Sequence, residues 1–399
     1  MVAHNDTVAS MLSSVRVLDF SMFLAGPYCT RLMADLGAEV LKVEPPSGDF
    51  LRNAPPIREG HSTHFGHFNC GKKSVAVDLK TDRGRDLILA LVERCDVLLE
   101  NFRPGVMERL GLSYEDVCAR KPDIIYCSVS GYGQSGPSAH LPAFAPVVHA
   151  RSGHDLAAVR YNSKLDRPLA NRNTTADILA ALHALGAINA ALFHRALTGA
   201  GQRLDVALMD TMHMMLAYEY QEAQLPSDGL PPLYRPLRTA DGFLMIAPVS
   251  DQNFQALAET IGQPELVDDP RFQGGARFGN FEVLLEIAEG WSTTLPGREA
   301  ESALLDNGCP CSIYQTIGES AAEAQVVYRG SAVTVHDAVG AFNVPNAPFQ
   351  SAHTAIRARE WVAALGEHTE EVLFDLGMTE VEVSTLAQDG VIAGIRRGA

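Results

Sequence analysis

Short apolar segments alternate with stretches of helical periodicity in the first third of the chain. The strand-like segments are residues 15–20, 38–44, 74–79, 96–100 and 124–129. Between them, apolar residues recur with helical spacing in residues 27–36, which Gly37 ends, and in residues 81–94, which Thr81 begins. Repeated strand–helix–strand units predict an α/β fold, in which a Rossmann-like large domain contains a mostly parallel sheet.

A proline-rich segment interrupts this pattern after a long predicted helix, residues 173–195. Pro226, Pro231, Pro232 and Pro236 surround Gly229, which is typical of a linker. We therefore predict an N-terminal part of the large domain (1–222), a linker (223–240) and a small α+β domain (241–332). A second linker (333–350) and a C-terminal part of the large domain (351–399) complete the predicted organisation.

The charge balance restricts the partners. The 399 residues include 32 Lys and Arg against 48 Asp and Glu, a net charge of −16. Such a chain repels nucleic acid and anionic lipid overall, so a polyanionic ligand must meet a local basic cluster. We expect neither nucleic acid nor membrane as a partner, because the most apolar stretch, residues 178–193, is too short and too polar for a bilayer span.

Cysteine usage and the N-terminus suggest the compartment. The seven cysteines are an odd number, and only Cys309 and Cys311 are close together, at a spacing that fits neither a zinc knuckle nor CxxC. The first fourteen residues lack the pattern of a signal peptide. These features predict reduced thiols, no bound metal and a cytoplasmic protein.

The turn after the first strand tests the dinucleotide alternative. Residues 21–27 contain only Gly26 and do not form GxGxxG, so NAD is disfavoured. Basic residues recur near predicted strand ends: Lys42, Arg52, Lys72, Lys73, Arg103 and Arg109. In an acidic chain this concentration favours a phosphate site. The indication of a phosphate site is strongest at residues 101–105, where a predicted strand ends and a helix begins, because helix N-termini bind anions.

Seven segments, in order along the chain, resemble the family III CoA-transferases. They read VRVLDFSMFLAGPY, LGAEVLKVEPPSGD, NCGKKSVAVDLKT, DVLLENFRPGVMERLGL, CSVSGYGQSGP, TGAGQRLDVALMD and LGEHTEEVLFDLGM. The family includes formyl-CoA, carnitine and mesaconyl-CoA transferases, with 2-methylacyl-CoA racemase as a relative. The resemblance implies coenzyme A or an acyl-CoA as substrate, a ring-shaped subunit and an interlocked homodimer.

The resemblance also implies roles for individual residues. Those matching the family's CoA-binding segments are Ser21, Phe23, Leu24, Ala25, Pro45, Lys72, Lys73, Asn101, Arg103 and Arg109. Leu24 stands where formyl-CoA transferases resemble one another in having Gln. Asp177 matches the catalytic aspartate, in the first turn of the helix that starts near Asn173. A carboxylate suits acyl transfer because its adduct is a mixed anhydride, and at a pKa near 4 it is already ionised.

Three functions remain open. CoA transfer, within one molecule or between two, would use Asp177. A racemase needs a second base, typically His, but Phe144 occupies that position and Gly153-His154-Asp155 lies out of register. The third is a non-catalytic CoA-binding protein, in which Asp177 merely complements the helix dipole.

The second acid is suggested by basic residues before Asp177. Phe144, His149, Arg151 and Arg172 are candidate substrate contacts, with Arg160 and Arg167 in the same stretch. If one or two of these arginines bind a second carboxylate, the acid is a C4 or C5 dicarboxylate such as mesaconate, succinate or citramalate. They can equally be surface or inter-subunit ion-pair residues. Formyl-CoA transferases resemble one another in a run of glycines in the second domain, which this sequence lacks, so the resemblance places formyl or oxalate chemistry below the dicarboxylates.

Overall fold

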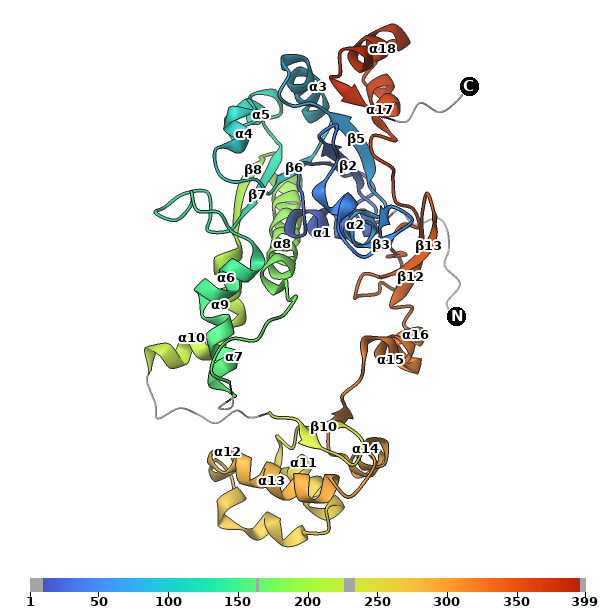
Figure 1. Cartoon of the computed structure of the whole chain (residues 1–399). Coiled ribbons are helices and arrows are strands. Elements are labelled where there is room, and N and C mark those ends of the chain that lie inside the picture. The colour runs from blue at the N-terminus through green and yellow to red at the C-terminus, as the bar shows by residue number, and fades with distance from the viewer. Residues whose placement is uncertain (1–9, 163–164, 226–233, 395–399) are drawn as a thin grey trace. The chain divides into compact units, whose positions relative to one another are not determined.

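The computed structural model describes residues 10–162, 165–225 and 234–394 (Figure 1). The chain forms two compact units, of which the first comprises Met1–Leu156, Pro168–Ala217 and Val327–Ala399. The second comprises Ala157–Arg167 and Tyr218–Val326. Most prolines of the first predicted linker, Pro226, Pro231 and Pro232, lie outside the described residues.

A seven-stranded sheet forms the centre of the first unit, in the order β14-β5-β2-β1-β6-β7-β8. Its strands are β1 (Arg16–Asp19), β2 (Glu39–Glu44), β5 (Lys73–Val77), β6 (Val97–Glu100), β7 (Ile125–Ser130), β8 (Gln202–Ala207) and β14 (Ile392–Ala393). All neighbours pair in parallel except β14, which runs antiparallel to β5. The predicted α/β class with a mostly parallel sheet is therefore confirmed. The strand order reverses between β1 and β6, where doubly wound sheets bind ligands at the strands' carboxyl ends.

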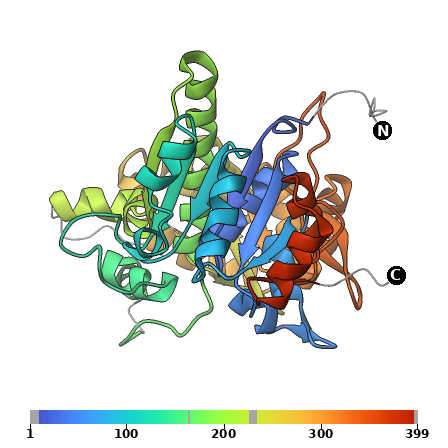
Figure 2. The same ribbon diagram turned by 90° about the horizontal axis from the view of Figure 1, so that it is seen from above.

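Helices cover both faces of this sheet, because its strands are apolar on both sides. In β7, for example, Cys127 and Val129 join one core cluster and Tyr126 the other. One face carries α1 (Ala25–Asp35), α6 (Ala145–Ser152), α8 (Thr175–Thr198) and α9 (Leu208–Met215). The other carries α3 (Asp82–Val92), α4 (Val106–Arg109), α5 (Tyr114–Arg120), α17 (Thr369–Asp375) and α18 (Glu380–Gln388). The C-terminal helices thus pack beside the N-terminal strands (Figure 2).

Shorter elements complete the description of this part of the chain. They are β3 (Ile57–Arg58), β4 (His61–Ser62), α2 (Thr63–Asn69) and the 3₁₀ helix η1 (Phe50–Asn53). Two further helices, α7 (His154–Arg160) and α10 (Ala217–Gln224), begin in the first unit and continue into the second. The predicted second linker, residues 333–350, contains regular structure, since β12 (Ala332–Asp337) and β13 (Gly340–Pro345) form an antiparallel hairpin. Val333, Val335 and Val344 alternate with polar residues and bury one face of the hairpin, which explains why this segment is not extended linker.

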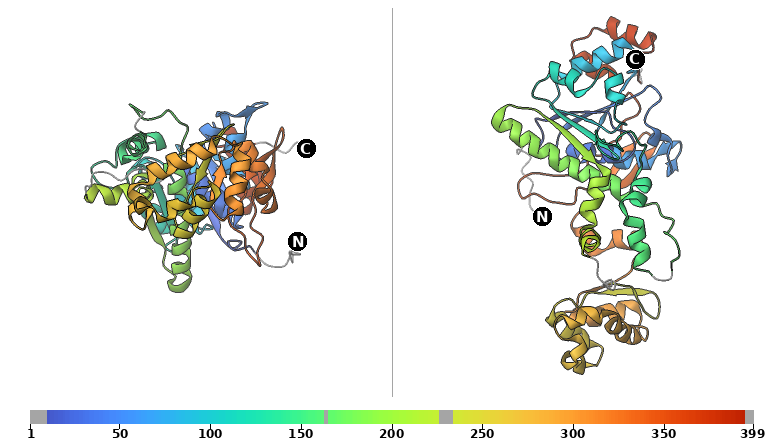
Figure 3. Two further views of the ribbon diagram at one scale, coloured as in Figure 1. Left: turned by 90° about the horizontal axis from the view of Figure 1, so that it is seen from below. Right: turned by 90° about the vertical axis from the view of Figure 1, so that its left-hand side faces the viewer.

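The second unit has its own apolar core around an antiparallel three-stranded sheet in the order β11-β10-β9. The strands are β9 (Leu237–Arg238), β10 (Phe243–Ile246) and β11 (Cys311–Ile313). The helices, which gather on one side of the strands (Figure 3), are α11 (Asp251–Thr260), α12 (Ala276–Gly279), α13 (Phe281–Ser292) and α14 (Gly297–Asp306). Two 3₁₀ helices, η2 (Pro264–Asp268) and η3 (Pro270–Phe272), and two short helices, α15 (Ile317–Ala322) and α16 (Ala324–Tyr328), also occur.

Helix α8 is longer than the apolar stretch noted in the sequence. Among the described residues it is one helix that is long and apolar enough to cross a membrane by length and composition alone. Its buried face consists mainly of small residues that pack on the sheet, namely Ala176, Ala180, Ala181, Ala184, Ile188 and Ala191. In this fold α8 is therefore a covering helix of the sheet.

Candidate active site

The turn between β1 and α1 lies at the point where the strand order reverses. The Asn101 side chain, directly after β6, fixes this turn: its Oδ1 accepts the Met22 N–H at 2.8 Å and its Nδ2 donates to the Met22 carbonyl at 2.7 Å. Phe23 consequently holds a φ of +62°, which bulky residues rarely adopt. Asn101, a predicted CoA contact, thus has its amide bonded to the turn, and the residue also lines the cavity described below.

The single glycine of this turn has a steric role. A Cβ on Gly26 would lie 2.2 Å from the Ser21 Cβ and 2.9 Å from a methyl group of Leu99. Only glycine lets α1 begin this close to β1 and β6. Gly26 therefore allows the close packing of this turn against the start of α1.

Lys72, a predicted phosphate contact, is bonded to protein groups within the fold. It is 1% exposed, and its Nζ donates to Asp19 Oδ2 at 3.0 Å, to Asn69 Oδ1 at 2.9 Å and to the Pro27 carbonyl at 2.8 Å. Burial lowers the pKa of Lys72 to about 8, although the Asp19 charge acts in the opposite direction. A buried ammonium must be paired in this way, so Lys72 stabilises the base of the turn.

Most of the predicted basic cluster is neutralised internally in the same manner. Lys42 pairs with Asp49 at 2.9 Å, Arg52 with Glu44 at 2.6 Å and Lys73 with Glu39 at 2.7 Å. Ser21 is buried, and its carbonyl accepts Lys42 Nζ, whereas Pro45 is exposed. Arg103 and Arg109 differ, because both are exposed and neither meets an acidic group within the described ranges. They are the cations available to an anionic ligand.

A cavity of about 450 Å³ opens beside the turn. It is lined by Phe23, Leu24, Ala25, Leu51, Asn101, Phe102, Arg103, Val129, Ser130, Gly131, Ala143, Phe144, Ala145, Pro146, Thr174, Asp177 and Leu208. The structure therefore brings Asp177 together with the predicted residues of the β1–α1 turn and the β6–α4 connection. Arg103 and Asp177 are the charged residues of this lining, and the remaining wall is mostly apolar.

Asp177 is presented to the cavity by the first turn of α8. Asn173 Oδ1 accepts the Thr175 N–H at 2.8 Å, and His149 Nε2 accepts the Ala176 N–H at 3.1 Å. Burial raises the pKa of Asp177 to about 7. The expectation of a carboxylate with a pKa near 4 is thus corrected: the apolar wall disfavours the charged form, and no cation in the described chain offsets it.

An aromatic group borders the cavity. The Phe23 ring contacts Phe50 and Phe144, with centroid separations of 5.4 Å in both cases. Phe144, a predicted substrate contact, is 55% exposed and lines the cavity. No base therefore faces Asp177 from this position.

The other predicted substrate residues do not line the cavity. His149 is buried behind the first turn of α8. Arg151 donates to Ser138 Oγ at 3.0 Å and stacks over Tyr132. Arg160 forms two hydrogen bonds to Glu222, at 2.8 and 2.7 Å, while Arg167 and Arg172 are exposed to solvent. The arginines that were expected to bind a second carboxylate thus do not gather around Asp177 in this subunit.

His149, His154 and Asp155 lie close enough to be considered as a metal site. Because His149 Nε2 accepts a backbone N–H, the neutral ring carries its proton on Nδ1. With Nε2 engaged, His149 could offer a metal ion only its Nδ1, and only after losing that proton. All seven cysteines lie in the described residues, and each is free.

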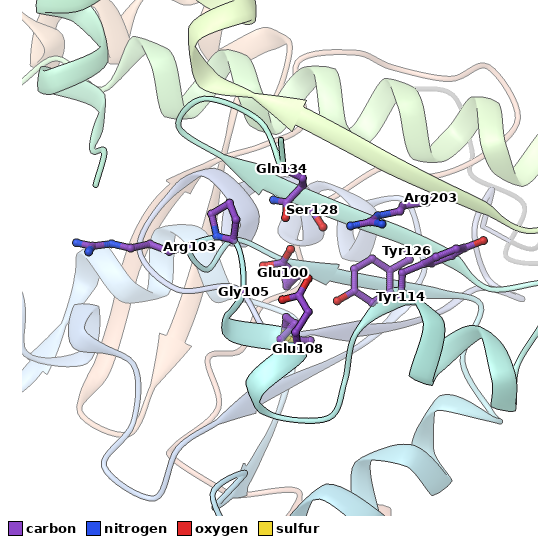
Figure 4. A pocket seen from close by; sticks show the side chains of 11 residues that line it. Glu100, Arg103, Gly105, Glu108, Tyr114, Tyr126, Ser128, Gln134 and Arg203 are labelled. Carbon is purple, nitrogen blue, oxygen red and sulfur yellow. The ribbon is translucent and has the colours of Figure 1, made fainter. Parts of the chain in front are cut away.

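A second, very small cavity of about 10 Å³ lies under the β6–α4 connection (Figure 4). Figure 4 shows the carboxyl groups of Glu100 and Glu108 facing each other, while Arg103 extends away from them. Glu100 Oε2 accepts the Phe102 N–H at 2.8 Å, and burial raises the pKa of Glu100 to about 7. Glu100 thereby bonds to the backbone of the β6–α4 connection. The cavity has room for about one water molecule.

Sequence reasoning missed several lining residues, notably Leu51 and Ser130. Leu51 lies in a short 3₁₀ helix for which no sequence pattern was considered. Ser130 ends a strand that was predicted, and its position at the carboxyl edge of the sheet was the available signal.

Comparisons with known proteins identify the family of this chain. The profile of CoA-transferase family III matches residues 12–369. The mouse succinyl-CoA:glutarate CoA-transferase is 33% identical, with coverage of 96% of this chain and 90% of the relative. The succinyl-CoA–D-citramalate CoA-transferase of Chloroflexus aurantiacus is 34% identical, with coverage of 96% and 98%. The formyl-CoA:oxalate CoA-transferase of Streptomyces avermitilis is 30% identical, with coverage of 96% and 99%.

Solved structures show the same similarity. A crystal structure of a mutant of Rv3272 from Mycobacterium tuberculosis superposes with a TM-score of 0.83 at 30% identity, covering 91% of this chain and 98% of that one. A CAIB/BAIF family protein from Brucella suis gives a TM-score of 0.79 at 29% identity, with coverage of 92% and 100%.

Proposed function

Because this chain belongs to CoA-transferase family III and is an enzyme that moves CoA between acids, we propose that Asp177 is its nucleophile. The observation that carries the proposal is the position of Asp177, which faces a cavity at the switch point of the sheet. Asp177 is the carboxylate of that lining, and ligands of doubly wound sheets bind at this edge.

The reaction proceeds by two acyl exchanges at this carboxylate. Asp177 attacks the donor thioester, and CoA thiolate leaves as a mixed anhydride forms. The thiolate then attacks the aspartyl carbonyl, which gives an aspartyl-CoA thioester and releases the donor acid. The acceptor acid repeats these steps in reverse, and the apolar wall excludes the water that would hydrolyse the intermediates.

Coenzyme A is held by two parts of the site. The phosphates meet Arg103 and Arg109, the exposed cations without acidic partners described above. The pantetheine arm passes the β1–α1 turn at Phe23, Leu24 and Ala25, whose side chains line the cavity.

The acid is a C4 or C5 dicarboxylate. The support comes from relatives, whose names contain succinate, glutarate, citramalate and mesaconate. Since Arg151 and Arg172 do not line the cavity, they are not part of this proposal.

A homodimer of interlocked, ring-shaped subunits in the cytoplasm completes the proposal. Large apolar side chains of α8 are exposed, among them Phe193 at 70% and Leu197 at 71%. A second copy of the chain is the partner that would cover them, as such clusters on one helix usually mark an interface.

Racemisation is not favoured. Two bases are needed on opposite sides of the α-carbon, and Asp177 is the one carboxylate or imidazole among the described residues that line the cavity. His149 and His154 do not line it.

The test is a mass-spectrometric screen of succinyl-CoA against a panel of free acids. A new acyl-CoA with one dicarboxylate, absent with Asp177→Ala, supports the proposal. Loss of α-deuterium from a 2-methylacyl-CoA without any acceptor acid would support racemisation instead.

A further inference from the structure

Ser130 differs from the other buried hydroxyl groups near the cavity. It is the last residue of β7, lines the cavity with Asp177 and is 7% exposed. Its Oγ has no hydrogen-bond partner among the described residues. By contrast, the hydroxyl of Thr30 donates to Asp19 at 2.6 Å, and that of Ser128 bonds to Glu100.

A buried hydroxyl without a partner is unfavourable, so such groups in folded proteins call for an explanation. Here the position supplies one, because the cavity is where a thioester carbonyl must lie within reach of Asp177. A carbonyl oxygen that becomes negatively charged is a strong acceptor, and a fixed donor beside it stabilises that charge.

We propose that Ser130 is a catalytic hydrogen-bond donor to the oxygen of the reacting acyl group. This inference rests on the proposed function of Asp177. As an Asp177 oxygen bonds to the thioester carbon, the C=O π pair moves to the oxygen, and the Ser130 O–H donates to it. No proton is transferred: the oxyanion collapses, the C–S bond breaks, and CoA thiolate leaves.

Other side chains of the lining are less suited to this role. Leu24 and Phe144 have no polar atoms, and the Asn101 amide is committed to Met22. Thr174 belongs to the same turn as Asp177 and is partly exposed. The N-terminus of α1 adds to the effect, because Leu24 offers no side-chain cap and the first turn contains no acid.

The test compares Ser130→Ala with Ser130→Thr and with Ser128→Ala, a buried serine of the same strand that does not line the cavity. We expect Ser130→Ala to lower kcat by about tenfold to a hundredfold while both KM values stay within about twofold, and Ser130→Thr to recover most of kcat. Ser128→Ala should keep its kcat.

The contrary results are equally clear. If Ser130→Ala raises KM for acyl-CoA and leaves kcat unchanged, the hydroxyl binds the pantetheine arm, and the inference is wrong. The inference is also wrong if Ser130→Ala leaves kcat unchanged, or if Ser130→Ala and Ser128→Ala lower kcat equally. Thermal melting separates folding from chemistry, because removing an unpaired hydroxyl should not lower Tm. Absence of transfer by the unmutated enzyme with every acid would contradict the proposed function itself.

Discussion

His149 Nε2 accepts a hydrogen bond from the backbone N–H of Ala176, at 3.1 Å, one residue before Asp177. Helix α8 has no side-chain cap from Thr174, so this contact satisfies one of the N–H groups that a helix start leaves open. A side chain from α6 thereby bonds to the turn that presents Asp177 to the cavity. We therefore propose that His149 positions this turn; the sequence analysis suggested a substrate contact for the same residue.

Replacing His149 should therefore misplace Asp177 without removing it. We expect His149→Ala to lower kcat by about tenfold, and His149→Gln, whose amide oxygen can accept the same N–H, to lose less. Steady-state kinetics with both substrates measure this. Equal loss in the two variants would indicate that the imidazole has another role.

The His149 contact also predicts a pH effect on stability. Burial, with a smaller contribution from His154, lowers the pKa of His149 from its usual 6.5, whereas Asp155 acts in the opposite direction. The neutral ring thus contributes stability above about pH 6.5, which is lost as pH falls through the lower value of the folded state. Tm should fall more steeply on acidification for the unmutated chain than for His149→Gln. Parallel curves would contradict this account.

The raised pKa of Asp177 predicts how activity depends on pH. Attack requires the ionised carboxylate, so kcat/KM should rise as pH increases towards about 7 and then level off. A profile that is flat from pH 5 to pH 8 would show that Asp177 is ionised throughout, as for an exposed acid.

The same shift has a consequence for stability. The protonated acid favours the folded state below about pH 4, and this advantage is lost as pH rises towards 7. Asp177→Asn should consequently stabilise the protein at pH 8, by about 1–2 kcal/mol after allowance for partial exposure, and have little effect at pH 4. Urea unfolding at the two pH values measures the difference, and stabilisation at pH 4 alone would contradict the sign.

Lys72 and Lys73 form a matched pair for a stability test. Lys72→Ala removes the cation bonded to the buried Asp19 and should cost about 3–5 kcal/mol of the free energy of unfolding. Lys73→Ala removes partly exposed ion pairs and should cost less than about 1 kcal/mol. Urea unfolding of both variants checks this. If Lys72→Ala folds normally but has a higher KM for acyl-CoA, Lys72 contacts the ligand.

Arg109 and Arg151 make a similar comparison for binding. Arg109→Ala should raise KM for acyl-CoA about tenfold at low ionic strength, with a smaller effect in high salt, because a charged contact to phosphate is lost. Arg151→Ala should change neither KM value, since it stacks over Tyr132 outside the cavity. A raised KM for the acid in Arg151→Ala would instead support binding of the second carboxylate by this arginine.

The sheet could be predicted because its strands are short apolar runs that stay buried on both faces, which few other structures allow. The resemblance singled out Asp177, and the structure places it in the lining of a cavity. The burial and ion pairing of Lys42 and Lys72 could not be predicted, because only the folded sheet brings their partners, Asp49 and Asp19, close to them. Likewise, the pKa of Asp177 depends on an apolar wall assembled from distant segments.

The central claim is that Asp177 carries the acyl group and then CoA. Its most direct test is peptide mass spectrometry after incubation with a donor acyl-CoA and acid quenching. We predict a covalent CoA adduct on the peptide that contains Asp177, absent in Asp177→Ala, which should also lack transfer activity. An active enzyme whose adduct lies on another residue, or an Asp177→Ala variant that still transfers CoA, would contradict the account.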